Sequence, residues 1–407
     1  MSRLPALAVR NVGRNRRRSL ITGVAIVIAV IMVMLLKGFV DGAGALMTAD
    51  VVEGRSGALQ VHKKGYVDSI ESVPTGLNMP YTPELIAKMK AVPNVKGVTG
   101  RIVFNGLVSN GVTQTMFVGR ALDLEREEEA CPRSKSIVSP GGKPLEPGDT
   151  TRALIGFELA ESFDTKLGNT ISVQSSSPGG RSNAIDVTVK GFSVSSFPFE
   201  NKRVLAVPLK TAQELIDLEG RVTEYAIGVH DLAKLEQTRR DLQAALGPDY
   251  EVHTWAELNT FVRDVINRQS IIFSAISVVL FIIALTVIAN TMLMSVFERV
   301  REIGTLLAVG VRRFQVLQLF ILEAAVIGLV GGVAGAVIGR FALLVIATIG
   351  IPIELPGTSG KAMLQPYVTP AFVAGAVVVA IFGALLASAL PARRASRLNP
   401  VDALRNA

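Results

Sequence analysis

The sequence has very few of the side chains on which enzymes and metalloproteins depend. Its 407 residues include one cysteine, Cys131, and three histidines, His62, His230 and His253. A single cysteine excludes an intramolecular disulfide, and the histidines are too far apart for a metal-binding motif. We therefore expect no metal in this chain, surface or strand positions for the histidines, and no catalytic or lipidated role for Cys131.

Catalytic and nucleotide-binding motifs are missing as well. No Gly-x-Ser-x-Gly or His-Glu-x-x-His occurs. The segment Gly357-Thr-Ser-Gly-Lys361 resembles part of a phosphate-binding loop but lacks its spacing. The sequence thus predicts a chain that is not an enzyme and binds no cofactor. We interpret Glu127-Glu-Glu129 as a solvated loop.

Acidic residues are absent from the first 18 positions, and long apolar runs are abundant elsewhere. Hydrophobic residues make up 49% of the chain, and the mean hydropathy is +0.42. Because about 20 apolar residues cross a bilayer, four runs qualify as transmembrane helices. They occupy residues 19–39, 269–297, 314–349 and 371–391.

Positive charge collects at the ends of these four runs. Residues 38–269 carry a net charge of −4, whereas the rest of the chain carries +12. Arginine and lysine in short loops mark the cytoplasmic side of a membrane. We therefore expect both termini and the loop 298–313 to be cytoplasmic, and residues 40–268 to lie outside. This placement at span ends argues against a basic protein that binds nucleic acid.

The two ends of the chain are short and basic. Residues 1–18 have helical apolar spacing with arginines on another face, which predicts an amphipathic helix along the inner leaflet. A disordered basic arm is the alternative. No small-residue cleavage site follows the first apolar run, so we interpret residues 19–39 as an uncleaved anchor. The tail, residues 392–407, is also basic.

The outer segment mixes strand and helix patterns. Short alternating runs and turn signals predict an α/β unit formed by residues 50–109 and 200–255, with a β-rich piece, residues 110–199, inserted. Asn110-Gly111 predicts a hairpin between two strands. The fold class is therefore an α-helical membrane protein with four transmembrane helices and a large α/β extracytoplasmic domain between the first two. A loop, 350–370, joins the last two helices.

The third apolar run contains glycines at i, i+4 spacing, which let another helix approach closely. The pattern does not say whether that neighbour is the fourth helix of the same chain or a second copy. The glycines are Gly328, Gly331, Gly332, Gly335 and Gly339.

The charged segment 298–313 must lie at a membrane surface, because an apolar helix precedes it and another follows. Val300, Ile303, Leu307 and Val311 recur at helical spacing. On this pattern alone, a rigid helical lever and a plain charged loop are equally good interpretations.

Three segments resemble the ABC transporter permeases of the MacB/FtsX/Lol superfamily. They are Glu298-Arg-Val-Arg-Glu-Ile-Gly304 with its continuation to Arg313, the tail Pro391–Arg405, and the start, Ala8–Ser19. Gly57–Tyr66 and Val204–Leu215 look most like the lipoprotein-releasing branch, LolC/LolE. The resemblance covers the whole chain, including the layout of one span, a large domain and three spans.

The resemblance implies a permease of the bacterial inner membrane that works by mechanotransmission. Two copies of a separate ATPase would bind ATP and Mg²⁺, and a second permease, identical or related, would complete the transporter with membrane lipids around it. A periplasmic carrier or adaptor would receive the substrate. Residues 298–313 would form the coupling helix. Its ATPase-coupling residues would be Glu298, Arg299, Arg301, Glu302, Ile303, Gly304, Leu307, Ala308 and Gly310.

In the lipoprotein-releasing branch, the substrate is held between the first two helices of the paired permeases. The same positions here predict a substrate cavity, lined by Val27, Ile31, Met34, Leu35, Phe261, Val265, Ile272 and Ile276. We therefore predict release of lipoproteins from the outer leaflet of the inner membrane. The alternatives are MacB-like efflux of hydrophobic compounds or peptides, and an FtsX-like scaffold that activates a periplasmic hydrolase.

Overall fold

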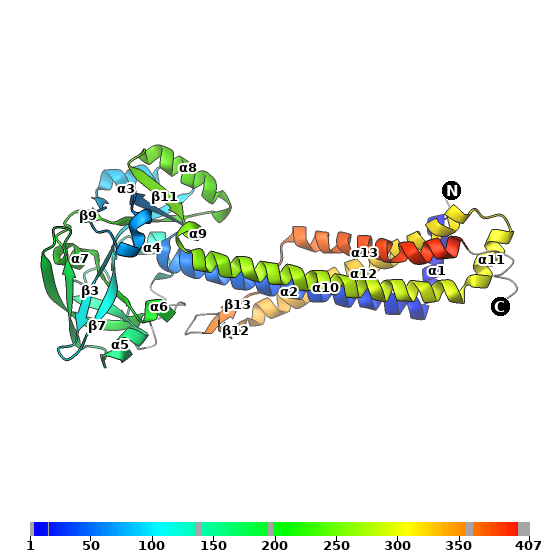
Figure 1. Cartoon of the computed structure of the whole chain (residues 1–407), viewed down its shortest axis with the longest axis horizontal. Coiled ribbons are helices and arrows are strands. Elements are labelled where there is room, and N and C mark those ends of the chain that lie inside the picture. Colours follow the sequence, from blue (N-terminus) through cyan, green and yellow to red (C-terminus); the bar gives the residue numbers. More distant parts are fainter. Residues whose placement is uncertain are drawn as a thin grey trace. The chain divides into compact units, whose positions relative to one another are not determined.

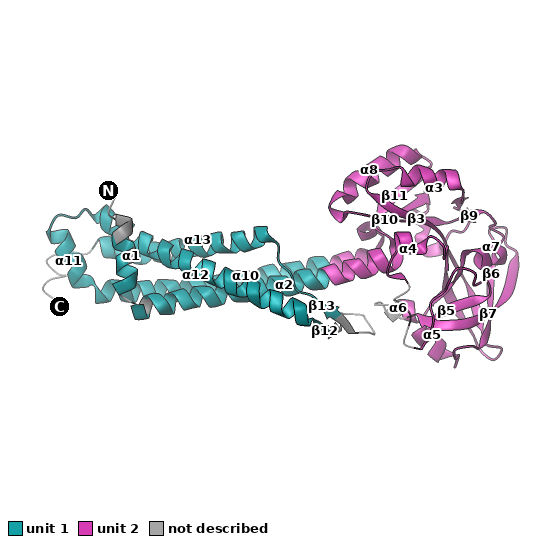
Figure 2. Ribbon diagram, turned by 180° about the vertical axis from the view of Figure 1, so that it is seen from behind, with its two compact units in different colours: residues 1–44, 265–352, 363–407 teal, residues 45–264, 353–362 magenta. Residues whose placement is uncertain are grey.

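The computed structural model describes residues 4–14, 16–134, 138, 141–193, 198–354 and 361–397. It divides into two compact units, coloured separately in Figure 2. The first, here called the helix bundle, comprises residues 1–44, 265–352 and 363–407. The second, here called the large domain, comprises residues 45–264 and 353–362.

Helices make up most of the bundle (Figure 1). Four of them are long and apolar enough to cross a membrane, which confirms the predicted number of spans. The elements of the bundle are α1 (Leu4–Arg14), α2 (Arg16–Val51), α10 (Thr260–Glu298), α11 (Val300–Ala308), α12 (Arg313–Ile349), β12 (Ile351–Glu354), β13 (Lys361–Leu364) and α13 (Pro370–Ser396).

Three of the spanning helices are longer than a bilayer requires. With 36, 39 and 37 residues, α2, α10 and α12 would each measure about 55 Å, against about 30 Å of hydrocarbon. The first two of these helices extend beyond the predicted spans 19–39 and 269–297: α2 continues to Val51, and α10 already begins at Thr260. Residues 40–51 contain no proline and several strong helix formers, so nothing ends α2 at residue 39.

The predicted amphipathic helix of residues 1–18 is shorter in the structure. Helix α1 ends at Arg14, and Arg16 and Arg17 belong to α2. Gly13 lies in the last turn of α1, where the weak helix propensity of glycine favours an end. Ala8 is fully buried.

The glycines of α12 contact two helices of the same chain. Gly331, Gly335 and Gly339 face α2: a Cβ atom built on Gly335 would lie 2.9 Å from the Cβ of Val30 and 3.0 Å from the carbonyl oxygen of Val27. Side chains at these three positions would therefore push α2 away from α12.

The other two glycines of the set face α13. A Cβ atom built on Gly328 would lie 2.8 Å from the Cβ of Ala384, and one built on Gly332 would lie 3.1 Å from the Cβ of Ala380. The sequence left the neighbour open between the fourth helix and a second copy. In the structure, α12 uses one glycine face for α13 and another for α2.

A nine-stranded sheet forms the centre of the large domain. Its strand order is β11-β1-β10-β3-β4-β8-β5-β7-β6. The strands are β1 (Leu59–Lys63), β3 (Val95–Ser109), β4 (Gln114–Leu122), β5 (Arg152–Gly156), β6 (Thr170–Ser176), β7 (Ser182–Ser193), β8 (Val204–Pro208), β10 (Glu224–Val229) and β11 (Tyr250–Thr254).

Six of these strands close on themselves. The last strand, β6, pairs with the distal half of β3 at Gly106–Ser109, while the proximal half of β3 pairs with β10. The long β3 is therefore shared between an open four-stranded antiparallel sheet and a closed β-barrel. The predicted hairpin at Asn110-Gly111 is present between β3 and β4, with φ of +89° at Gly111.

The predicted division of the large domain needs one correction. Strand β8 was assigned to the α/β unit of residues 200–255, but it pairs with β4 and β5 inside the barrel. Its apolar sequence, Val204–Pro208, suits either sheet. Only the long-range pairing, which short-range periodicity does not encode, decides where it belongs.

Helices α3 (Pro83–Lys90) and α8 (Leu235–Leu246) bury one face in the core of the open sheet (Figure 1). Ile86 and Met89 contribute from α3, and Leu242 and Leu246 from α8. The remaining elements are η1 (Val52–Ser56), η2 (Val67–Ser72), β2 (Met79–Pro80), α4 (Glu127–Ala130), α5 (Phe157–Ser162), α6 (Pro198–Asn201), α7 (Leu209–Leu215), β9 (Arg221–Val222), η4 (Leu232–Lys234) and α9 (Trp255–Leu258).

The close approach of α2 and α12 makes a prediction for the glycine face. Replacing Gly335 with valine should lower the melting temperature of the purified protein, since overpacking costs about 1–3 kcal/mol. Gly23→Ala is the matched control, because a Cβ atom there meets nothing within 4 Å. Equal melting temperatures for Gly335→Val and the unchanged protein would show that the two helices do not pack as described.

Candidate functional site

Helix α11 is a short amphipathic helix between two spanning helices. Its apolar residues Ile303 and Leu307, and Val311 after its end, pack with Val316 and Phe320 of α12 in one cluster. Gly310 ends the turn, with φ of +95°, a conformation that glycine adopts without strain. The segment 298–313 therefore contains a packed helix rather than a plain loop.

A buried ion pair fixes the start of α11. The guanidinium of Arg299 donates from Nη1 to both carboxylate oxygens of Glu323 in α12, at 3.0 and 3.2 Å. Glu323 is only 2% exposed. The same guanidinium lies 5.6 Å from the centre of the Phe320 ring. Since a buried charge without a partner is costly, the pair holds α11 to α12.

Helix α1 joins the same network. The side-chain amide of Asn11 donates to Glu323 at 2.7 Å. Arg14 donates to Glu302 at 2.6 Å, and Arg299 donates from Nε to the same carboxylate at 3.0 Å. We call these five residues the basal network. It connects α1 to α11 and α12, whose partner residues lie 288 and 312 positions further along the chain.

Charge in the basal network shifts the titration of its exposed carboxyl. Burial opposes ionisation of Glu302, but hydrogen bonds and charge from Arg299 and Arg14 outweigh it and hold the pKa of Glu302 below its ordinary value. Burial likewise opposes the charge of Arg299, and Glu323 and Glu302 raise its pKa overall. Both groups are therefore charged at neutral pH.

Exposed apolar residues occur where α11 ends and α12 begins. Leu306 lies in the last turn of α11 and is 38% exposed, Val309 directly follows the helix and is 81% exposed, and Phe314 lies in the first turn of α12 and is 63% exposed. We call these three residues the apolar tip. The exposed polar residues Arg301 and Thr305 flank it.

The predicted coupling residues divide between these two faces. Glu298, Arg301, Glu302, Ala308 and Gly310 are exposed, whereas Arg299, Ile303 and Gly304 are buried and Leu307 is half-buried. The buried residues hold α11 in position, and only the exposed residues can contact a partner protein. Leu306, Val309 and Phe314 were not among the predicted coupling residues.

The residues predicted to line a substrate cavity between paired permeases fall into two groups in this chain. Met34 is fully buried, and it packs with Val27 and Ile31 against the glycine face of α12. Leu35 packs against the bundle core. On α10, Phe261, Ile272 and Ile276 are exposed and Val265 is half-buried. The predicted residues of α2 therefore face the interior of the bundle, because the glycines of α12 let this face of α2 pack closely against it.

A second charged cluster lies inside the large domain. Arg101 of β3 is 1% exposed and pairs with Glu127 of α4 through two nitrogens, one of them Nε at 3.2 Å from Oε2. It also donates to the carbonyl oxygen of Arg55 and, at 3.0 Å, to the sulfur of Cys131. Arg55 itself pairs with Glu200 at 2.6 Å. We call this cluster the junction network.

The junction network corrects one expectation. Glu127 is a buried ion-pair partner at the start of a helical turn rather than part of a solvated loop. The sequence does not reveal this, because the partner, Arg101, lies on another strand of the fold.

His62 lies in strand β1, in agreement with the expectation of a surface or strand position. It is fully buried, stacked on Tyr66 with ring centres 4.6 Å apart, and lies 3.8 Å from Glu224.

Cys131 is buried in the same place. Burial raises the pKa of its thiol to about 11, although the charge of Arg101 opposes the rise. The thiol is therefore protonated at neutral pH and unreactive. Among the residues that the structure describes, no three His, Cys, Asp or Glu side chains are grouped to hold a metal ion.

Two sequence families match this chain. The MacB-like periplasmic core domain matches residues 19–245, and the FtsX-like permease C-terminal family matches residues 274–400. The first match covers more than half of the chain. The protein therefore belongs to the MacB/FtsX superfamily of ABC transporter permeases, in agreement with its sequence motifs.

The sequence matches to related proteins cover different shares of this chain. An uncharacterised ABC transporter permease of Methanocaldococcus jannaschii is 22% identical over 98% of this chain and 96% of its own length. A macrolide export ATP-binding/permease protein, MacB, of Wolinella succinogenes is 28% identical, and the match covers 98% of this chain but 60% of MacB. A pyoverdine export ATP-binding/permease protein, PvdT, of Pseudomonas syringae is 32% identical over 43% of this chain and 25% of its own length.

Solved structures resemble the chain in part. The extracellular domain of the transporter YknZ from Gram-positive bacteria aligns with 48% of this chain and 99% of its own, at 15% identity and a TM-score of 0.34. The periplasmic region of MacB from Actinobacillus actinomycetemcomitans aligns over 50% of this chain and 92% of its own length, at 10% identity and a TM-score of 0.36.

The basal network predicts a strong effect of removing one buried partner. Glu323→Gln removes the buried countercharge of the Arg299 guanidinium and leaves only the exposed Glu302 carboxylate, so the free energy of unfolding should fall by about 1–3 kcal/mol. Thermal unfolding in detergent measures it. Arg301→Gln, which removes an exposed arginine of the same helix, should change it by less than about 0.5 kcal/mol. Similar values for the two variants would contradict the role of the pair.

The lowered pKa of Glu302 predicts a pH dependence of the contact between α1 and α11. A depressed carboxyl pKa contributes stability above its unfolded value of about 4.3, and that contribution is lost as the pH falls through the folded pKa. Spin labels on the two helices should therefore give a narrow distance distribution at neutral pH that broadens only in strong acid. Glu302→Gln should broaden it at every pH. A narrow distribution in that variant would exclude the contact.

Proposed function

We propose that this chain is the permease subunit of an ABC transporter that exports hydrophobic or amphiphilic compounds or peptides, driven by ATP hydrolysis in a separate ATPase. The superfamily membership supports an ABC transporter permease. Relatives named for macrolide and pyoverdine export support efflux. The chain has no complete phosphate-binding loop, so two copies of a partner ATPase would bind ATP and Mg²⁺.

The apolar tip of α11 carries this proposal. Exposed apolar residues at the end of a rigid element suit a protein partner, since burying them in an interface is favourable. The arginines around α11 support a cytoplasmic position for it by the positive-inside rule, and an ATPase has access to ATP on that side. We assign the tip as the docking surface and the exposed Arg301 and Glu302 as its polar rim.

The basal network would transmit motion of the docked ATPase to the helices of the bundle. Motion of α11 would reach α12 through Arg299 and Glu323, and α1 through Glu302 and Arg14. Helix α1 leads directly into α2, whose far end belongs to the large domain. Near that end, the junction network ties the carbonyl of Arg55 to Arg101, so a displaced α2 would act on the domain through hydrogen bonds rather than through a loose linker.

Export fits better than the lipoprotein release predicted from the sequence. The relatives that name a substrate name macrolides or pyoverdine. A second permease, identical or related, and a periplasmic adaptor would complete the transporter in the inner membrane. The FtsX-like scaffold is less well supported, because a closed barrel and an open sheet form a far larger outer domain than signalling by that member requires.

Docking at the apolar tip is testable with one side chain. Val309→Asp should reduce co-purification of the partner ATPase by about ten-fold, the effect of about 1.4 kcal/mol. The melting temperature should not change, because Val309 is exposed. The matched control is Val112→Asp, which introduces the same charge at an 89% exposed valine of the large domain. Equal ATPase recovery from the two variants would remove the tip as docking surface.

The substrate class is tested with the reconstituted complex. ATPase activity raised by a macrolide or an amphiphilic peptide, and abolished in the Val309→Asp variant, is the expected result. Stimulation by triacylated lipoprotein alone would instead support the lipoprotein-releasing branch. A complex that binds a wall hydrolase and responds to neither substrate would favour the signalling scaffold.

A further inference from the structure

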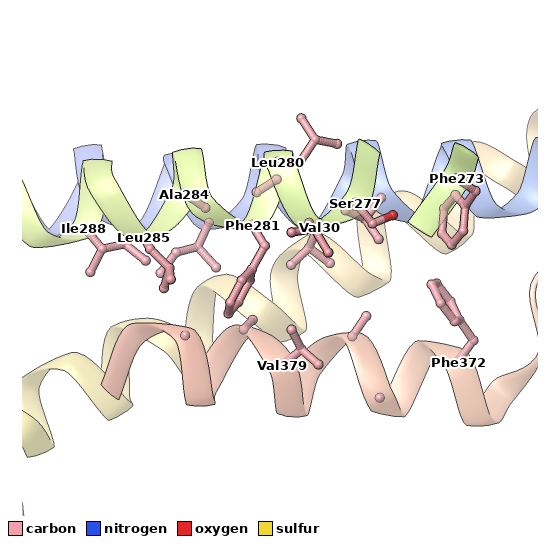
Figure 3. Close-up of a pocket in the computed structure, with 18 residues that line it drawn as sticks. Val30, Phe273, Ser277, Leu280, Phe281, Ala284, Leu285, Ile288, Phe372 and Val379 are labelled. Carbon is pink, nitrogen blue, oxygen red and sulfur yellow. The ribbon is translucent and has the colours of Figure 1, made fainter. Parts of the chain in front are cut away.

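The helix bundle contains an apolar groove that no part of the proposed function uses. It lies between α2, α10 and α13 and has a volume of about 480 Å³, within the range of about 300–1,000 Å³ typical of ligand sites. Figure 3 shows side chains from α10 and α13 converging on it. Its walls include Val30, Phe281, Leu285 and Val379, and Ser277 contributes the single polar side chain of the lining.

Aromatic rings close one end of the groove. Phe273 of α10 and Phe372 of α13 face each other there, with ring centres 6.5 Å apart (Figure 3). The ammonium group of Lys37 lies 5.5 Å from the centre of the first ring and 5.8 Å from the centre of the second. These distances allow cation–π contact with both rings.

Lys37 forms an ion pair with Asp41. Its ammonium lies 2.6 Å from Oδ1 of Asp41, one helical turn further along α2. Both side chains keep about a quarter of their surface exposed. The apolar groove therefore ends at one positive and one negative charge, placed where α2 leaves the bundle.

We propose that the groove binds an acyl chain of a zwitterionic phospholipid whose phosphate lies at Lys37 and whose amine lies at Asp41. Three spanning helices form the walls, so hydrocarbon is the medium around the groove and an acyl chain can enter it without crossing water. The charge pair matches the two charges of such a headgroup. The lipid comes from the leaflet that contains the Lys37 end of α2.

A helix from a second copy of the chain fits this groove less well. The lining of α10 runs from Phe273 to Ile288, about 22 Å of helix, whereas a spanning helix needs about 30 Å of apolar contact. The aromatic rings and the charge pair close the groove at one end. A lipid, which has an apolar chain and a charged end, matches both features.

Gly375 provides a direct test of the lipid site. It lines the groove, and a Cβ atom built on it meets nothing within 4 Å, so Gly375→Phe should fill the groove without disturbing the fold. The full-length protein in nanodiscs would be photolabelled with phosphatidylethanolamine carrying a diazirine in its acyl chain. We expect labels on the lining of α10 and α13, and about ten-fold less labelling in Gly375→Phe.

Two further variants separate the lipid site from its alternatives. Val378→Phe adds the same ring to an exposed position of α13 outside the groove and should leave labelling unchanged. Lys37→Gln should reduce retention of phosphatidylethanolamine in native mass spectrometry. Labels spread evenly around α10 and α13 and equal in all variants would mean annular lipid only and would overturn the proposal.

The remaining alternative is a partner helix in the groove. Gly375→Cys should form no disulfide-linked dimer under mild oxidation if a lipid occupies the site, since Cys131 is buried. A disulfide-linked dimer through residue 375 would instead show that a second copy covers it. These outcomes do not depend on the ATPase, so failure of the lipid site leaves the export proposal intact, and failure of export leaves the lipid site intact.

Discussion

The cost of burying charge organises the base of this protein. Glu323 lies in an apolar helix and is almost fully enclosed, so it must have a partner in the same place. Arg299 and Asn11 supply one, and with them the start of α11 and one face of α1 are fixed on α12. The orientation of α11, and therefore the exposure of its apolar tip, follows from this single requirement.

The same principle recurs where the chain enters the large domain. Arg101 is buried in β3 and holds Glu127, Cys131 and the carbonyl of Arg55 around it. Ladder hydrogen bonds alone would leave the end of α2 free to move against the sheet. With a buried guanidinium between them, the π-helical segment after α2 is bonded to the sheet directly, and a movement of one element is resisted by the other.

Much of the architecture was predictable, because it depends on local pattern. Four apolar runs and the hairpin at Asn110-Gly111 each follow from composition and spacing. The candidate site was predictable only in part. Helical spacing identified the inward face of α11. The exposure of Val309 and Phe314 was not predictable, because apolar residues are common next to membrane spans and the sequence does not show which of them stay uncovered.

Sequence alone determined how many helices cross the membrane, where charge lies along the chain and which superfamily motifs it carries, since these are properties of contiguous residues. Tertiary structure alone decided which face of α2 meets the glycines of α12, that β8 completes a barrel, and that Glu127 and Glu323 are paired inside. Each of these depends on residues separated by tens or hundreds of positions. The sequence around a charged residue does not show which distant residue will pair with it, and only that pairing offsets the cost of burying the charge.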